Sequence, residues 1–229
     1  MSLTTGRGPL GPNRAGRFTA PVPDGVGYVE PHPRRIQARL GGATVLDTEE
    51  VLLVHRPGQV LTYAFRPGAV GDLPNVEVPE APGYVSVPWD AVDTWIEEGR
   101  ELVSYPPNPY HRIDCRPTRR HLRAEVAGTV LVDTDDTLIL FETALAPRLY
   151  VARTHVLVEL QPTATRTWCN YKGWATYWAA TVDGTVVDDV AWSYEDPLPE
   201  STPIAGMLSF DEKVVEATAA LPEPGEVPG

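Results

Sequence analysis

The chain has 229 residues, which is enough for one large domain or two small ones with cores of their own. Its formal net charge is −12 and its 19 Lys and Arg residues are scattered, so no basic stripe could neutralise a phosphate backbone. Nucleic acid and anionic membrane surfaces are therefore not expected as partners. The sequence has no apolar run long enough to span a bilayer and no secretory signal pattern, so we expect a cytoplasmic protein.

Both ends of the chain have compositions that disfavour regular structure. Residues 1–33 are rich in Gly, Pro and Arg and show no hydrophobic periodicity, which predicts an irregular amino-terminal arm. Residues 216–229 are acidic and proline-rich, and we expect a disordered tail there.

The body of the chain contains an internal repeat. Residues 34–70 align without a gap on residues 120–156, and both segments alternate apolar and polar residues around a glycine, Gly42 in one and Gly128 in the other. Each copy predicts a β-hairpin followed by two further strands. The sequence therefore predicts two related halves.

The two halves differ in completeness. Residues 34–117 form a degenerate first repeat, and residues 118–215 form a complete second repeat that carries an extra aromatic segment. Near the end of the first repeat, apolar residues recur at helical spacing with acidic residues between them. This pattern predicts one connecting helix at about 90–103.

The clearest hairpin of the sequence is "YWAATVDGTVVDDVAWSY", in which Asp183-Gly184 suits a two-residue type I′ turn. Counting outward from that turn puts Tyr177 opposite Val190. Strand alternation then places four side chains on one face and Trp178 on the other. The four are Tyr177, Val190, Trp192 and Tyr194. A β-bulge at Asp188-Asp189 would change this assignment.

The aromatic segment 167–178 holds three Trp, two Tyr, Cys169 and Lys172 within twelve positions. Such residues could build only a core, because Trp and Tyr bury large areas. A lysine among aromatic rings is costly to bury without an acidic partner or an anionic ligand. We therefore expect Lys172 at the rim of an opening, with Glu142 and Asp189 as its possible structural partners.

Metal chemistry is not favoured by the sequence. The acidic runs at 133–136 and 188–189 could supply carboxylates, but such residues are ordinary at hairpin connections. No Gly-rich phosphate loop accompanies them, and the five His residues show no ligand spacing with either cysteine. We expect no metal and no cofactor.

The two thiols, Cys115 and Cys169, are expected to be unpaired, because a cytoplasmic compartment is reducing. Cys169 is the candidate nucleophile of any enzyme here, since the nearby ammonium of Lys172 would favour its thiolate form. A small half-buried side chain at a sheet corner is the alternative for Cys169.

Five motifs of the second repeat stand in a recognisable order. They are Cys-x-Tyr-Lys-Gly at 169–173, Tyr-Trp at 177–178, Trp-Ser-Tyr at 192–194, Asp-Pro-Leu-Pro at 196–199 and Ile-Ala-Gly at 204–206. In these motifs the second repeat resembles, nearly end to end, the family catalogued as domain of unknown function 427. Asn170 stands where the family usually has proline, and His155 stands where it usually has an acidic residue.

This resemblance implies a mainly β fold of the α+β class. It would consist of two β-tent-like repeats, each with small antiparallel sheets pinned together at one end, the first repeat being incomplete. Domains of similar shape include B-type methionine sulfoxide reductases and the drug-binding domain of cereblon, and such likeness of fold is a weak guide to function. The family itself implies no activity.

From these observations we expect a non-enzymatic module that binds a small molecule in an aromatic-lined pocket of the second repeat. Its ligand would be flat and carry an acceptor or a negative charge. The predicted ligand-binding residues are Tyr171, Lys172, Tyr177, Trp192, Tyr194 and Glu142. The alternatives are an enzyme of unassigned type that uses Cys169 or Lys172, and a protein–protein scaffold whose first repeat and arm form a homodimer surface.

Overall fold

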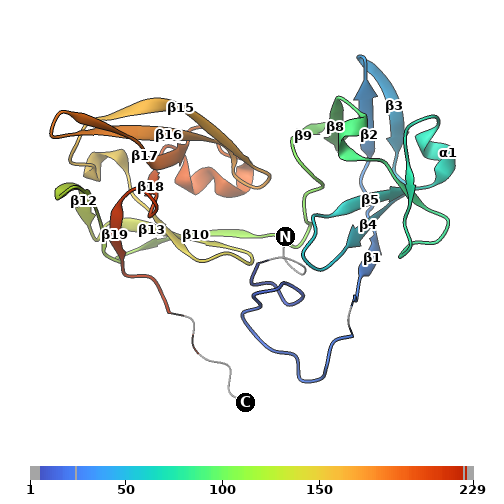
Figure 1. Cartoon of the computed structure of the whole chain (residues 1–229), viewed down its shortest axis with the longest axis horizontal. Helices are drawn as coiled ribbons and strands as arrows, with labels where there is room; N and C mark the ends of the chain where they lie inside the picture. The colour runs from blue at the N-terminus through green and yellow to red at the C-terminus, as the bar shows by residue number, and fades with distance from the viewer. Residues whose placement is uncertain (1–5, 24, 224, 226–229) are drawn as a thin grey trace. The chain divides into compact units, whose positions relative to one another are not determined.

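The computed structural model describes residues 6–23, 25–223 and 225, and it is mainly β, as the sequence predicts. The chain divides into two compact units with a boundary between His111 and Arg112 (Figure 1). Among the described residues, none of the helices has the length and apolar character that crossing a membrane requires.

The first unit is built from two antiparallel sheets. One sheet has the order β1-β4-β5-β7-β6, with strands Tyr28–Pro31, Val51–His55, Thr62–Phe65, Val85–Ser86 and Val76–Glu77. The other has the order β3-β2-β8-β9, with strands Ala43–Thr48, Ile36–Leu40, Thr94–Glu97 and Arg100–Leu102. A short helix α1 (Pro67–Val70) and a 3₁₀ turn η1 (Trp89–Ala91) connect strands. Buried residues of both sheets, such as Ile36, Leu53 and Phe65, share one core.

The predicted helix at 90–103 is wrong, because β8 and β9 form a hairpin there. Glu98 and Gly99 connect the two strands with φ values of 47° and 82°, the left-handed conformation that a tight hairpin turn requires. Trp95 and Ile96 are both buried although they are adjacent, so β8 is covered on both faces. A strand that is buried on both faces does not alternate apolar and polar residues. The apolar residues of such a strand can therefore match a helical period as well.

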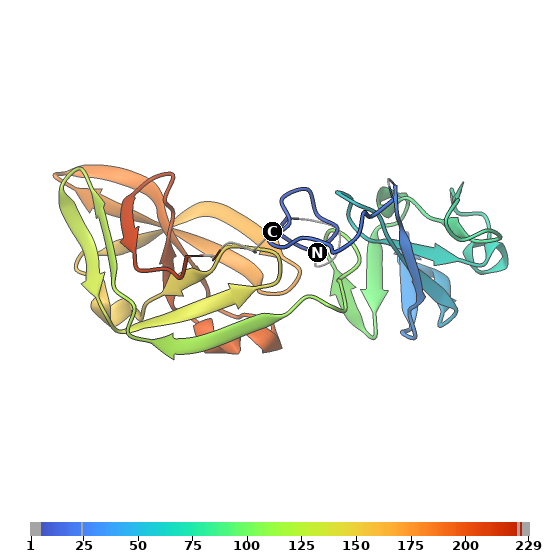
Figure 2. The same ribbon diagram turned by 90° about the horizontal axis from the view of Figure 1, so that it is seen from below.

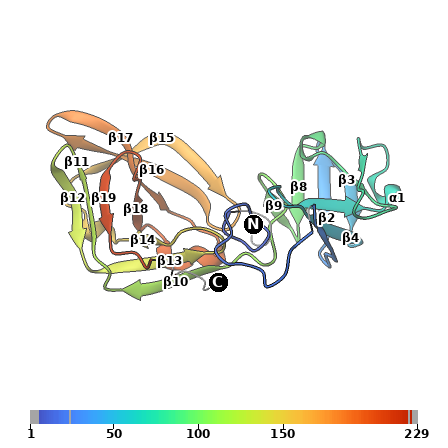
Figure 3. The same ribbon diagram turned by 60° about the horizontal axis from the view of Figure 1, so that its bottom comes forward.

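The second unit contains three antiparallel sheets. The first has the order β10-β13-β14, with strands Ile113–Thr118, Thr137–Glu142 and Arg148–Tyr150. The second has the order β12-β11-β19, with strands Thr129–Thr134, Leu122–Val126 and Glu216–Ala219. The third has the order β15-β16-β17-β18, with strands Leu160–Cys169, Gly173–Val182, Thr185–Tyr194 and Leu208–Phe210. Figure 3 shows β10, β13 and β14 on one side of this unit and β15, β16 and β17 on the other.

Two short 3₁₀ turns complete the second unit, η2 (Arg153–His155) and η3 (Pro199–Ile204). Figure 2 shows η3 beside β10, and residues of these two elements are in contact. The predicted disordered tail begins too early, because β19 continues the chain as a strand paired with β11 from Glu216 to Ala219. Part of the remaining tail, residues 224 and 226–229, lies outside the described residues.

The two repeats have the same hairpin geometry. Ile36 pairs with Thr48 in the first hairpin, and Leu122 pairs with Thr134 at the equivalent positions of the second. Each hairpin has its register shift directly after the aligned alanine, Ala38 in one repeat and Ala124 in the other. This shared register agrees with the alignment of the two segments, and their common origin stays a prediction.

The hairpin of β16 and β17 has the predicted two-residue turn, with Val182 opposite Thr185. Farther out, Tyr177 pairs with Trp192 and not with Val190 as predicted, because residues 188–190 of β17 oppose only Ala179. Across this irregularity β17 has two more residues than β16. Because side chains alternate between the faces with a period of two, an excess of two leaves the facing of the outer residues unchanged. Tyr177, Trp192 and Tyr194 therefore share a face, while Val190 packs in the core on the opposite face with Trp178.

Candidate functional site

The polar and aromatic residues singled out in the sequence meet in one cluster of the second unit, which we call the inter-sheet cluster. It joins side chains of the β10-β13-β14 sheet to the face of β16 and β17 that carries Tyr177. Its members are Ile113, Cys115, Leu138, Leu140, Tyr150, Cys169, Tyr171, Ala175, Tyr177, Trp192, Tyr194, Ile204 and Met207. The end of β13 and the turn between β15 and β16 thus place Glu142 beside Lys172 at the base of this cluster, although the two residues are 30 positions apart.

Lys172 and Glu142 form a buried ion pair, with side-chain exposures of 9% and 7%. The expectation that Lys172 lies at a rim is wrong, because the carboxylate of Glu142 removes the need for solvent or a ligand at its ammonium. Its Nζ atom also lies 5.8 Å from the centroid of the Tyr194 ring. Asp189, the other partner considered, instead accepts hydrogen bonds from Thr163 and Thr165.

The Cys-x-Tyr-Lys-Gly motif is the tight connection between β15 and β16. Gly173 has φ = +94°, which residues with a side chain rarely adopt, and a Cβ atom there would lie 3.4 Å from the backbone oxygen of Asp196. The backbone N–H of Leu198 donates to the oxygen of Lys172 at 3.1 Å, and Ser201 Oγ donates to the oxygen of Tyr171 at 3.1 Å. The motif therefore fixes the lysine backbone, and its glycine is required by the conformation.

Both cysteines are free, as predicted, and both belong to the inter-sheet cluster. Cys169 Sγ lies 4.0 Å from Glu142 Oε1, at the limit for a hydrogen bond that a thiol donates. Burial raises the pKa of the Cys115 thiol, the charge of Asp114 adds to this effect, and the charge of Lys172 opposes it. A thiol whose pKa is raised in this way is expected to be inert.

Two buried tyrosines lie in the interior of the inter-sheet cluster. Tyr150 is 1% exposed and Tyr194 is 6% exposed. Burial raises the pKa of each phenol, and the negative charge of Glu142 acts in the same direction on both. Both hydroxyls therefore stay protonated at neutral pH and can serve as donors but not as bases.

The outer edge of the cluster is only half-buried. The Tyr177 and Trp192 rings lie there with centroids 6.3 Å apart, and the Tyr177 hydroxyl lies 3.2 Å from Thr167 Oγ1. The guanidinium carbon of Arg148 lies 4.8 Å from the Trp192 ring centroid. Sequence reasoning missed Arg148, although it is two positions from Tyr150 on a strand and thus shares its face.

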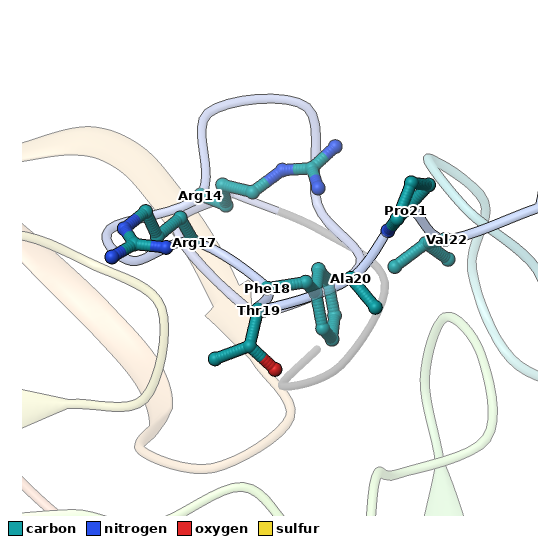
Figure 4. Close-up of a pocket in the computed structure, with 7 residues that line it drawn as sticks. All are labelled: Arg14, Arg17, Phe18, Thr19, Ala20, Pro21 and Val22. Atoms are coloured by element: carbon teal, nitrogen blue, oxygen red, sulfur yellow. The ribbon is translucent and has the colours of Figure 1, made fainter. Parts of the chain in front are cut away.

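Other predicted or possible sites do not assemble in the same way. Among the described residues, no group of three His, Cys, Asp or Glu side chains is placed to hold a metal ion. Asp133, from the acidic run at 133–136, pairs with His121 and Arg123. The arm forms a hollow of about 550 Å³ lined by Arg14 and residues 17–22 (Figure 4). One irregular segment supplies all these walls, and no carboxylate or thiol lies among them.

The predicted binding residues thus fall into two sets. Glu142, Lys172 and Tyr194 are buried at the base of the cluster, whereas Tyr171, Tyr177 and Trp192 are only half-buried. The chemistry available at the half-buried edge is an indole face, a phenol and a guanidinium. The chemistry available below it is a carboxylate, an ammonium and a thiol.

Comparison with known families supports the resemblance seen in the sequence motifs. Residues 114–220 match the family model described as Domain of unknown function (DUF427). No curated protein matches the chain. The matched segment runs from β10 to just beyond β19 and contains nearly all of the inter-sheet cluster. The second unit is thus the part of the chain that is similar to the family described as Domain of unknown function (DUF427).

Proposed function

We propose that the second unit binds a small, flat, anionic molecule at the half-buried edge of the inter-sheet cluster. The observation that carries this proposal is the Arg148 guanidinium held over the Trp192 indole. A flat aromatic anion can stack on an indole and pair with a neighbouring guanidinium, whose planar donors suit a carboxylate.

The exposure of Arg148 indicates that a ligand anion can replace its present carboxylate partner. Its side chain is 41% exposed, and its carboxylate neighbour Glu212 lies 3.8 Å away with 58% exposure. Exposed ion pairs of this kind contribute little free energy, so a ligand anion could replace Glu212 at small cost. The Tyr177 hydroxyl adds a hydrogen-bond donor on the same face.

The burial pattern also favours binding over a scaffold role. A scaffold would bury these aromatic rings completely against the rest of the unit, but Tyr177 and Trp192 keep intermediate exposure. The buried Glu142–Lys172 pair below them adds an argument, because such pairs cost desolvation energy and apolar residues that replace both partners often give equal stability. The presence of such a pair in an aromatic cluster is consistent with a role in shaping a site.

The test uses a matched pair of flat probes, 2-naphthoate and its uncharged analogue 2-naphthamide. Calorimetry should give saturable binding of 2-naphthoate, and the indole N–H signal of Trp192 should shift in NMR spectra. Arg148→Met should weaken 2-naphthoate by at least about 10-fold, or ~1.4 kcal/mol, and leave 2-naphthamide unaffected.

Arg153→Met is the control, because the Arg153 guanidinium stacks on Trp178 at 4.0 Å on the other face of the sheet. This variant should bind 2-naphthoate as the unchanged protein does. Failure of both probes to bind, or equal losses in the two arginine variants, would contradict the proposal.

A second candidate function is thiol chemistry at Cys169, favoured by its contact with Glu142 Oε1 at 4.0 Å. A carboxylate within hydrogen-bond reach can act as the base that accepts the thiol proton. Cys115 lacks such a contact among the hydrogen bonds of the described residues and has a raised pKa, which makes it an internal control.

Alkylation by iodoacetamide at neutral pH distinguishes the two thiols. If Cys169 is activated, mass spectrometry should show it modified at least about 10-fold faster than Cys115. Glu142→Gln should remove that difference. A Cys169 that reacts no faster than Cys115 would exclude this second function.

A further inference from the structure

The first unit contains a cavity of its own that the proposed function does not use. It has a volume of about 230 Å³ and lies among the start of β5, the end of β7, the strand β8 and the segment 104–106. All of its lining residues fall between positions 60 and 106, so the first unit forms it alone. We propose that this cavity is a binding site for an uncharged, flat molecule of one or two fused rings.

The floor of the cavity is apolar and fixed. Leu61, Tyr63, Val87 and Trp95 line it and are at most 8% exposed. Trp95 Nε1 donates to the backbone oxygen of Trp89 at 2.9 Å, which holds the floor indole in one orientation. The Tyr63 hydroxyl donates to the carboxylate of Glu97, which fixes the second ring. Fixed walls lower the entropy cost of binding.

The mouth of the cavity remains accessible. Val60 is 47% exposed, Ser104 is exposed, and the Trp89 ring is half-buried. Trp89 stacks on Trp95 with ring centroids 5.3 Å apart and an interplanar angle of 23°. A ligand ring that enters past Val60 therefore meets the Trp89 ring at the mouth and buried apolar side chains on the floor.

The lining decides the chemical class of the ligand. None of the twelve lining residues is charged, so the cavity offers no partner for an ionic group. Thr62, Ser86 and Ser104 contribute hydroxyls, and Trp and Tyr rings supply most of the contact surface. These groups suit an uncharged ring with one or two polar atoms.

The volume decides the size. An engineered apolar cavity of about 150 Å³ holds benzene, so about 230 Å³ accommodates a bicyclic ring such as indole. Drug-sized molecules need roughly 300–1,000 Å³ and would not fit. Indole is therefore a suitable probe, and indole-3-carboxylate is its charged analogue.

The experiment titrates the full chain with indole and follows the side-chain N–H signals of the six Trp residues by NMR. The signals of Trp89 and Trp95 should shift saturably with a dissociation constant below about 1 mM. Indole-3-carboxylate should bind this cavity at least about 10-fold more weakly, because no cation lines it. Absence of saturable shifts at Trp89 and Trp95 would overturn the proposal.

Two variants and a control localise the effect. Trp89→Ala should weaken indole binding at least about 10-fold, and Ser86→Leu should block it by filling the wall of the cavity. Trp174→Ala, at an exposed tryptophan of the second unit that neither proposed site uses, should leave indole binding at Trp89 and Trp95 unchanged. If Trp89→Ala proves unfolded, Ser86→Leu decides: a folded Ser86→Leu protein that still binds indole with unchanged affinity would overturn the proposal.

Discussion

Replacing Lys172 by methionine is expected to lower the free energy of unfolding of the second unit by about 3–5 kcal/mol. The substitution removes the ammonium but leaves the carboxylate of Glu142 buried, with 7% side-chain exposure. A buried charge without its partner costs far more than the pair itself contributes. Urea denaturation, followed through NMR signals of the second-unit tryptophans, measures the loss.

A double variant and a surface control separate the ion pair from other effects. Glu142→Gln combined with Lys172→Met should recover part of the loss, because no uncompensated charge then remains. Lys213→Met removes the other lysine of the chain, which is exposed, and should change the stability little. A Lys172→Met protein as stable as Lys213→Met would contradict the buried-pair account.

The ion pair also shows what a sequence can and cannot predict about this site. Composition alone suggests that Lys172 needs an acidic partner, and Glu142 was one of two candidates. The depth of the pair depends on how the β10-β13-β14 sheet packs against β16 and β17, which local sequence does not specify. Arg148 was missed for the same reason, because its position over Trp192 joins strands from two different sheets.

The strand predictions succeeded where one face of a sheet is buried and the turn chemistry is clear. Asp183-Gly184 fixed the hairpin of the aromatic segment, and Tyr177, Trp192 and Tyr194 kept their predicted common face because the excess of residues was even. Val190, which lies inside the irregularity, faces the opposite way and was wrongly predicted. The helix prediction failed at β8, where both faces are covered and period two disappears. Side-chain patterns thus predict strands only when one face meets solvent.

Glu97 in the first unit provides the second large effect, and it depends on pH. Its side chain is 7% exposed and accepts hydrogen bonds from Arg34 and Tyr63, with His32 Nε2 at 3.1 Å. Burial acts to raise the pKa of Glu97, but the hydrogen bonds of His32, Tyr63 and Arg34 outweigh it and lower the pKa to about 2. The ordinary value is 4.5.

A depressed pKa means that the folded state favours the charged carboxylate. Its contribution to stability is therefore fully present above pH 4.5 and is lost as the pH falls from 4.5 towards 2. Glu97→Gln should lower the free energy of unfolding of the first unit by about 3 kcal/mol at pH 7, since Arg34 loses its counter-charge and Tyr63 loses a charged acceptor. The difference between Glu97→Gln and the unchanged protein should shrink steadily below pH 4.5.

Glu80 is the matched control, because its pKa is also lowered to about 2, first by the hydrogen bond from Arg56, but its side chain is 30% exposed. Exposed ion pairs are screened by solvent and contribute little, so Glu80→Gln should cost much less than Glu97→Gln at pH 7. Urea denaturation at pH 7 and at pH 3, read through Trp89 and Trp95 of the first unit, measures both variants. Equal losses for Glu80→Gln and Glu97→Gln, or a Glu97→Gln loss that does not change between the two pH values, would show that the buried hydrogen bonds of Glu97 do not stabilise its charge.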